Sequence, residues 1–335
     1  MKVTVIGAGS WGTAVASLVG ASHDVQLWAR RPDVAAAINE TRHNPDYLVG
    51  HELTPGVRAT SELATAVSDA ELLVMGVPSH GYRAVMEQAA PHISPGIPIV
   101  SLAKGIEAVT LMRMTEVTAD VLADHDQSRI GVLTGPNLAG EIAAGQPAAS
   151  VIALPDEELA RQLQGVFSGP AFRVYTNTDV IGAESAGALK NVMAIGAGIA
   201  HGMGFGMNSI ATFITRALFE LTRLGSALGG KPLTFAGLAG MGDLIATCMS
   251  SQSRNHQVGF GIGQGKALDD IIAEMNMVAE GVKSTRGILA LGARHGVEMP
   301  IAEQVGRVLY ENATAVEILE ILMGREAGSE TEGLA

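Results

Sequence analysis

Apolar residues in the first half of the chain fall in short continuous runs, the pattern of strands that are buried on both faces of a parallel sheet. The runs that we interpret as strands cover residues 2–6, 24–29, 71–77, 97–102, 130–134 and 149–153. An Ala-rich helical pattern at 13–19 follows the first of them. This part of the sequence therefore predicts a doubly wound α/β domain.

Beyond residue 179 the pattern changes, because apolar residues recur at the three- and four-residue spacing of helices. The stretch 209–228 has such a stripe on one face, whereas 181–195 is apolar nearly throughout and rich in Gly and Ala. The second pattern predicts a helix that is packed on all sides. We therefore predict two domains, an α/β domain over residues 1–178 and an all-helical domain over residues 179–335.

Composition narrows the class of protein. The chain of 335 residues is 47% hydrophobic, enough for two cores, and its net charge of −12 argues against nucleic-acid binding through a basic face. Cys248 is the single cysteine, which excludes a disulfide framework and a cysteine-based metal site. We find no signal-peptide pattern and no uninterrupted apolar run of membrane-spanning length. We expect a cytoplasmic protein without membrane insertion.

Gly7, Gly9 and Gly12 form the pattern Gly-x-Gly-x-x-Gly between the first predicted strand and the helix that follows. In this context the pattern indicates a dinucleotide site, whereas a glycine-rich turn without a ligand is the alternative. Gly7 permits a tight turn, Gly9 lets the backbone approach a pyrophosphate, and Gly12 lets helix and strand pack closely. Free amides at the helix start would hold the phosphates.

Arg30 and Arg31 follow the second predicted strand, where a chain specific for NAD would carry an Asp or Glu for the ribose 2′-hydroxyl. Two guanidinium groups suit a 2′-phosphate and leave the carboxylate role unfilled. The alternative is a solvated arginine pair at a strand end. The sequence favours NADP(H), with NAD(H) as the other candidate.

Lys190 stands beside Asn191 within the apolar stretch 181–195. A buried ammonium is costly, and desolvation lowers the pKa of a lysine toward the range of acid–base catalysis. A lysine whose stem packs while its ammonium reaches water is the alternative. We interpret Lys190 as the acid/base of an active site.

Further polar residues accompany this candidate. Lys104 follows a predicted strand and falls at the carboxyl edge of the sheet, where ligands of open α/β sheets bind. Asp243 and Thr247 share a helix face and would hold the Lys190 ammonium, with a helix cap as the alternative for Asp243. A polar loop at 253–255 offers a hydroxyl, a guanidinium and an amide to a phosphate. We read 259–265 as a flexible connection.

With these residues in place, the chain resembles the bacterial NAD(P)-dependent glycerol-3-phosphate dehydrogenases from residue 1 to about 323. The stretches that carry the resemblance are 7–12, 44–48, 101–105, 135–137, 190–191, 237–243 and 253–255. The resemblance implies a Rossmann-like N-terminal domain and a helical C-terminal domain of the 6-phosphogluconate dehydrogenase type. It implies reversible reduction of dihydroxyacetone phosphate to sn-glycerol 3-phosphate for phospholipid synthesis, and we expect a homodimer.

Residue by residue, the resemblance implies that Lys190 is the proton donor and acceptor, oriented by Asp243 and Thr247. The implied substrate contacts are Lys104, Gly135, Asn137, Lys190, Asn191, Asp243, Ser253, Arg254 and Asn255. The implied cofactor contacts beside the glycines are Ser10, Trp11, Arg31, Tyr47, Lys104, Ala139, Arg254, Val278 and Glu280. Asn137 stands where many relatives have Ser, and both side chains form hydrogen bonds. No metal is expected, since an ammonium would polarise the carbonyl.

Two other functions remain open at this point. A 3-hydroxyacid or 3-hydroxyacyl-CoA type dehydrogenase shares the two-domain plan, but the acyl-CoA enzymes rely on a His–Glu pair, and His201 lacks an evident carboxylate partner. A dinucleotide sensor without catalysis would have no use for a buried lysine beside an aspartate.

Overall fold

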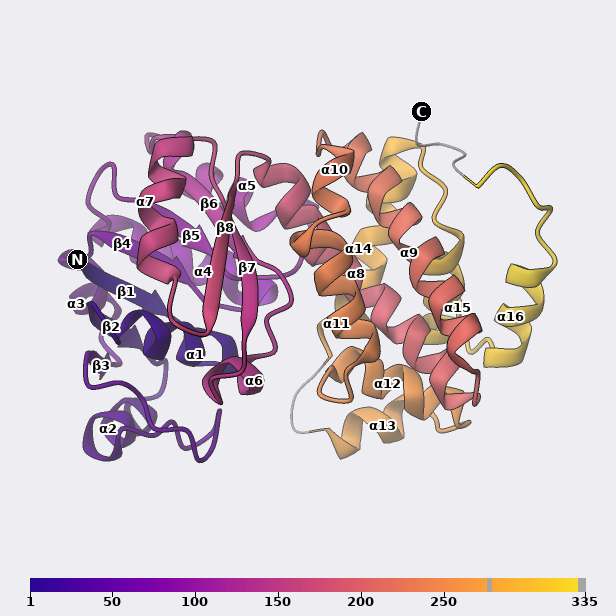
Figure 1. Cartoon of the computed structure of the whole chain (residues 1–335), viewed down its shortest axis with the longest axis horizontal. Coiled ribbons are helices and arrows are strands. Elements are labelled where there is room, and N and C mark those ends of the chain that lie inside the picture. The colour runs from indigo at the N-terminus through magenta and orange to yellow at the C-terminus, as the bar shows by residue number, and fades with distance from the viewer. Residues whose placement is uncertain (276–278, 331–335) are drawn as a thin grey trace. The chain divides into compact units, whose positions relative to one another are not determined.

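A computed structural model describes residues 1–275 and 279–330. By its internal contacts the chain divides into two compact units. Unit 1 comprises residues 1–107 and 112–180, and unit 2 comprises residues 108–111 and 181–335. Figure 1 shows the strands of unit 1 side by side in a sheet and the packed helices of unit 2.

Unit 1 is built on an eight-stranded sheet with the strand order β3-β2-β1-β4-β5-β6-β7-β8. The strands are β1 Lys2–Ile6, β2 Asp24–Trp28, β3 Val57–Thr60, β4 Leu72–Met75, β5 Ile99–Ser101, β6 Ile130–Thr134, β7 Ala148–Ala153 and β8 Phe172–Asn177. Its α-helices are α1 Ser10–Val19, α2 Pro32–Thr41, α3 Leu63–Ser68, α4 Ser79–Ala89, α5 Met114–Val121, α6 Ala139–Ala143 and α7 Glu157–Phe167. The predicted Rossmann-like architecture is confirmed.

The sheet departs from the prediction in direction and extent. Strand β7 pairs antiparallel with β6, while the other neighbouring strands pair in parallel. The connection between β6 and β7, residues 135–147, contains the five-residue helix α6 and returns the chain beside β6 in the opposite direction. The pattern also missed the edge strands β3 and β8, whose exposed Arg58 and Arg173 interrupt the apolar run.

Alternation along the central strands supplies a core on each face of this sheet. Val5 and Val74 belong to one buried cluster, whereas their neighbours Ile6 and Met75 belong to another. Successive side chains of a strand point to opposite faces, so both faces of β1 and β4 are covered. The continuous apolar runs of the sequence follow from this double burial.

Unit 2 is helical, as predicted. Its helices are α8 Val180–Gly202, α9 Met207–Ala227, α10 Pro232–Phe235, α11 Asp243–Met249, α12 Arg254–Gly263, α13 Leu268–Glu274, α14 Glu280–His295, α15 Pro300–Tyr310 and α16 Ala315–Met323, with a π-helical turn at Leu238–Gly242. Every residue of α8 from Gly182 to Ile199 is buried, as its apolar sequence predicts.

Glycines bring α8 and α12 into backbone contact. A Cβ on Gly259 would lie 1.9 Å from the Ile195 carbonyl oxygen, and one on Gly198 would lie 2.2 Å from that of His256. No larger side chain fits at either position. The prediction of a flexible connection over 259–265 is therefore wrong: most of that stretch is helix, and its glycines are packing surfaces.

Candidate active site

The glycine turn (residues 7–12) has the geometry that its spacing predicts. Gly7 adopts a φ of +114°, and a Cβ there would lie 2.7 Å from the Gly76 carbonyl oxygen. A Cβ on Gly12 would meet the Gly7 carbonyl oxygen at 2.0 Å, whereas Gly9 faces open space. No side chain caps the start of α1, and its first turn has no acidic residue. This open face and the uncapped amides fit a pyrophosphate.

Two further predicted cofactor contacts open α1. Ser10 is its first residue and is half-buried. The Trp11 ring lies 6.2 Å from that of Phe172, and its Nε1 is buried with no hydrogen-bond partner among the described residues. An indole N–H usually finds a partner when it is buried, so Trp11 retains an unused donor next to the glycine turn.

The arginine pair is not as free as the sequence suggested. Arg31 Nη2 lies 2.6 Å from Asp46 Oδ2 and 3.3 Å from Asp33 Oδ2, while Arg30 is exposed. The prediction that no carboxylate reads the ribose 2′-hydroxyl stays a prediction, but two carboxylates lie beside Arg31. Asp46 lies 34 residues after Gly12, outside the spacing of the fingerprint, whereas Asp33 lies 21 residues after Gly12, near that spacing, and was overlooked.

Asn44 ties this region to the glycine turn. Its Nδ2 donates to the Ala8 carbonyl and to Thr13 Oγ1, each at 2.9 Å. Its Oδ1 accepts from the amides of Asp46 and Tyr47 at 3.0 and 3.1 Å. Through these hydrogen bonds, Asn44 connects the backbone of Tyr47, a predicted cofactor contact, to the glycine turn. Sequence reasoning noted Asn44 within a motif but gave it no role.

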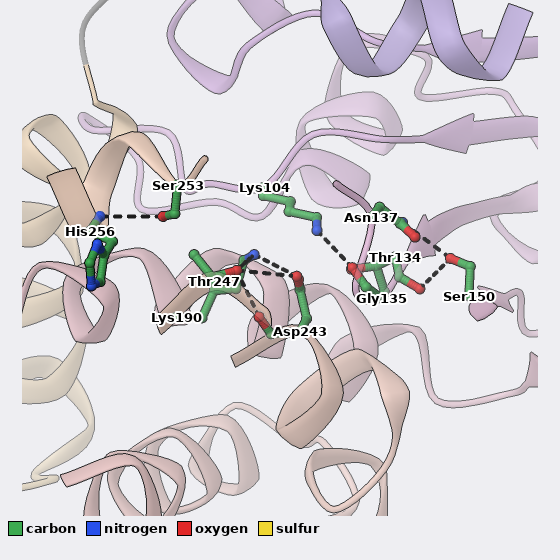
Figure 2. Close-up of polar contacts among 10 residues, drawn as sticks. All are labelled: Lys104, Thr134, Gly135, Asn137, Ser150, Lys190, Asp243, Thr247, Ser253 and His256. Atoms are coloured by element: carbon green, nitrogen blue, oxygen red, sulfur yellow. Dashed lines mark hydrogen bonds and ion pairs between the residues drawn. The ribbon is translucent and has the colours of Figure 1, made fainter. Parts of the chain in front are cut away.

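Lys104, Gly135 and Asn137 lie together at the carboxyl edge of the sheet. Lys104 Nζ donates to the Gly135 carbonyl at 3.0 Å, and Asn137 Nδ2 donates to Ser150 Oγ at 3.2 Å, as Figure 2 shows. Gly135 has a φ of +145°, and a Cβ there would be 3.1 Å from Ser150 Cα. Asn137 Oδ1 is buried without a partner among the described residues. Ala139 begins α6.

Lys190 lies in the middle of α8, and α11 brings two polar groups to it (Figure 2). Its Nζ donates to Asp243 Oδ1 at 2.5 Å and to Thr247 Oγ1. The Lys190 and Asp243 side chains are only 6% and 2% exposed, so the alternative of an ammonium that reaches water is wrong here. The Thr247 hydroxyl donates to the Asp243 carbonyl at 2.7 Å, which turns its lone pairs toward the ammonium.

The π-helical turn Leu238–Gly242 sets the position of Asp243. A Cβ on Gly240 would lie 2.1 Å from the Phe235 carbonyl oxygen, so the turn closes on itself as predicted. Gly242 stands at the N-cap of α11 and Asp243 is its first residue, without a side-chain cap. The alternative that Asp243 caps this helix is wrong. Asn191, next to Lys190, is 5% exposed.

The stretch 253–255 is not a loop, contrary to the prediction. Ser253 caps α12 by accepting from the His256 amide at 3.3 Å, and Arg254 is the exposed first residue of that helix. Asn255 is buried, and its Oδ1 accepts from the Gly281 amide at 2.9 Å. Serine is common at the N-cap of helices as well as in loops. The polarity of the stretch 253–255 alone therefore led to the wrong assignment.

Two further residues predicted to contact the cofactor are Val278 and Glu280. Val278 falls outside the described residues. Glu280 is the half-buried first residue of α14.

A histidine pair that joins α8 and α12 was not predicted from the sequence. His201 Nδ1 lies 2.7 Å from Nε2 of His256, which is 8% exposed. Burial, and then the neighbouring His201, lower the pKa of His256 below its usual value. Because the partner of His201 is an imidazole, the described part of the chain gives this histidine no carboxylate partner of the His–Glu kind.

Cys248 follows Thr247 and is buried, and burial raises the pKa of its thiol to about 12. A thiol with such a pKa stays protonated and is not a nucleophile at neutral pH. Across residues 1–275 and 279–330, no three His, Cys, Asp or Glu side chains are grouped so as to hold a metal ion. One stretch, Pro232–Met249, has the length and apolar composition of a membrane span, and 44% of it is buried.

Comparison with known proteins gives a consistent result. Residues 2–160 match the family model described as NAD-dependent glycerol-3-phosphate dehydrogenase N-terminus, and residues 179–320 match that of the C-terminus. A Sphingopyxis alaskensis protein named glycerol-3-phosphate dehydrogenase (NAD(P)+) 2 is 51% identical, with 98% of each chain covered. A Streptomyces coelicolor protein named glycerol-3-phosphate dehydrogenase (NAD(P)+) is 50% identical over the same shares.

Among solved structures, a crystal structure of glycerol-3-phosphate dehydrogenase from Coxiella burnetii superimposes with a TM-score of 0.91 at 34% identity, covering 97% of this chain and 99% of the other. A ketopantoate reductase from Ralstonia eutropha, at 18% identity and a TM-score of 0.57, is similar in fold alone.

Proposed function

The chain belongs to the NAD-dependent glycerol-3-phosphate dehydrogenase family, and on that premise we propose that Lys190 is the general acid/base of its reaction. The protein is an NAD(P)-dependent oxidoreductase that interconverts dihydroxyacetone phosphate and sn-glycerol 3-phosphate. The sn-glycerol 3-phosphate supplies phospholipid synthesis. The observation that carries the assignment is the buried contact of Lys190 with Asp243 and Thr247.

Lys190 donates a proton to the substrate oxygen as the carbonyl is reduced, and it accepts that proton in the reverse direction. Asp243 keeps the ammonium charged in a buried position, and Thr247 fixes its direction. A charged donor beside the oxygen also stabilises the negative charge that develops there. The nicotinamide cofactor, when bound, supplies or accepts the hydride.

Unit 1 provides most of the proposed cofactor site. The glycine turn and the amides at the start of α1 hold the pyrophosphate. The side chains or backbone positions that we assign to the cofactor are Ser10, Trp11, Arg30, Arg31, Tyr47, Lys104, Ala139, Arg254, Val278 and Glu280. A preference for NADP(H) over NAD(H) is part of the proposal and rests on the two arginines.

For the substrate, we assign cationic and polar groups that suit a small phosphorylated ketone. They are Lys104, Gly135, Asn137, Lys190, Asn191, Asp243, Ser253, Arg254 and Asn255. Arg254 is exposed at the start of α12, so both its guanidinium and the helix amides favour a phosphate.

We further propose a cytoplasmic homodimer that does not insert into membranes. The apolar stretch Pro232–Met249 is broken by the π-helical turn and contains Asp243, whose carboxylate pairs with Lys190. A carboxylate in such a position is costly in lipid unless its partner moves with it.

The decisive measurement is oxidation of NADPH and NADH with dihydroxyacetone phosphate. Lys190→Ala should lower kcat by at least ~100-fold while cofactor binding persists. Because that variant removes the cation that pairs with Asp243, Lys190→Arg is the second test: it keeps a cation that cannot be deprotonated. Lys266→Ala, an exposed lysine of unit 2, is the control. If the Lys190 variants keep more than about a tenth of wild-type kcat, the acid/base assignment is wrong.

A further inference from the structure

Arg31, the residue expected to read a 2′-phosphate, already has anionic partners. Asp46 Oδ2 and Asp33 Oδ2 both approach the same nitrogen of its guanidinium, at 2.6 and 3.3 Å. A 2′-phosphate that binds to Arg31 must share or displace these contacts. The hydroxyl of NAD(H) at the same place brings no charge and meets no such opposition.

The nearer carboxylate belongs to an anchored turn. Asn44 is 2% exposed, and its side chain spans from the Ala8 carbonyl and Thr13 to the amides of Asp46 and Tyr47. The backbone of Asp46 is therefore anchored to the glycine turn through Asn44. Asp33, by contrast, is in the first turn of α2, and its side chain is 72% exposed.

We propose that Asp46 is a specificity-determining residue that restrains the preference for NADPH. Its carboxylate neutralises Arg31 and repels a 2′-phosphate, and Asn44 holds it there. The inference rests on the proposed function only in that it takes Arg31 as part of the cofactor site. It predicts a chain that uses both cofactors rather than one that rejects NADH.

The test is the ratio of kcat/KM for NADPH to kcat/KM for NADH. Asp46→Asn removes the charge and keeps the shape, and the ratio should rise about 3- to 10-fold at low salt, as expected for one exposed charge beside a phosphate. Asp33→Asn should raise it about twofold or less, because its carboxylate is farther and more exposed. Glu52→Gln removes an equal charge beside a different arginine, Arg42, and should leave the ratio unchanged.

Binding of 2′,5′-ADP and of 5′-AMP, measured by calorimetry, separates this inference from the proposed reaction. Asp46→Asn should tighten 2′,5′-ADP and leave 5′-AMP unaffected, and the gain should disappear when Arg31 is replaced by Ala. If this pattern is found in a protein that reduces no phosphorylated ketone, the proposed function fails and the inference stands. An unchanged ratio and unchanged 2′,5′-ADP affinity in Asp46→Asn overturn it, as does an equal gain in the Arg31→Ala background.

Discussion

Glu220 in α9 predicts a measurable pH dependence of stability. Its side chain is 2% exposed, and its two oxygens accept from the amides of Ile301 and Ala302 at 2.6 and 3.3 Å, in the first turn of α15. Burial raises the pKa of this carboxyl from 4.5 to about 7, although the two backbone hydrogen bonds act to lower it. The charged form is therefore less favourable in the folded chain than in the unfolded one.

The sign of the effect follows from this direction. Below about pH 4.5 the carboxyl is protonated in both states, and its full contribution to folding is present. As the pH rises toward 7 the unfolded chain loses the proton first, so the free energy of unfolding falls. A pKa raised from 4.5 to about 7 corresponds to about 3 kcal/mol lost over that interval.

Glu220→Gln removes the titration while it keeps a carbonyl oxygen for the Ile301 amide. In urea unfolding followed by helical circular dichroism, its stability relative to wild type should improve by up to about 3 kcal/mol between pH 5 and pH 8. Glu320→Gln, at an exposed position of α16, is the matched control and should show no such trend. A difference between Glu220→Gln and wild type that is constant with pH would refute the reasoning.

Three other outcomes are expected. Arg254→Ala should cost about 2–4 kcal/mol in kcat/KM for dihydroxyacetone phosphate, mainly through KM, and should spare unphosphorylated dihydroxyacetone; equal loss with both would indicate a cofactor or folding role. Replacing Arg30 and Arg31 together by Ala should lower the ratio of kcat/KM for NADPH to kcat/KM for NADH about 10-fold. This is near the lower end for a charge-assisted contact, because Arg31 is already paired with carboxylates; an unchanged ratio would mean that the two arginines are only a solvated strand end. Gly259→Ala should lower the thermal midpoint of unit 2, since its Cβ would meet the Ile195 carbonyl. Gly287→Ala in α14, where the nearest atom to an added Cβ would be 3.7 Å away, should cost less, and equal midpoints would contradict the packing.

The burial of Lys190 in α8 was predictable because the pattern that indicates it is local in sequence. A lysine inside a Gly- and Ala-rich apolar stretch indicates a buried cation, and Asp243 and Thr247 at four-residue spacing share one helix face. The structure brings these groups together. The edge strands β3 and β8 were not predictable in the same way, since their exposed face carries charged residues and their apolar positions are few.

The glycine pattern led to a correct prediction in the glycine turn and to a wrong one over residues 259–265. In the glycine turn, a strand before and a helix after define the role of each glycine. Over 259–265 the same residue type indicated flexibility, but the glycines of α12 lie against α8, about 60 residues away in the chain. A glycine that is required by a distant backbone looks, in sequence, like one that is required by a turn.

Asn44 shows why the arrangement around Arg31 could not be derived from sequence. The side chain acts on Ala8 and Thr13, which precede it by 36 and 31 residues, and on Asp46 and Tyr47, which follow directly. Only the second, local half of this role follows from spacing, since an asparagine often bonds to amides two residues on. The first half requires the loop to return to the glycine turn. That return brings Asp46 next to Arg31. The positive charge around Arg31 is therefore smaller than the two arginines alone suggest, and the buried Asn44 side chain holds the loop that causes this difference.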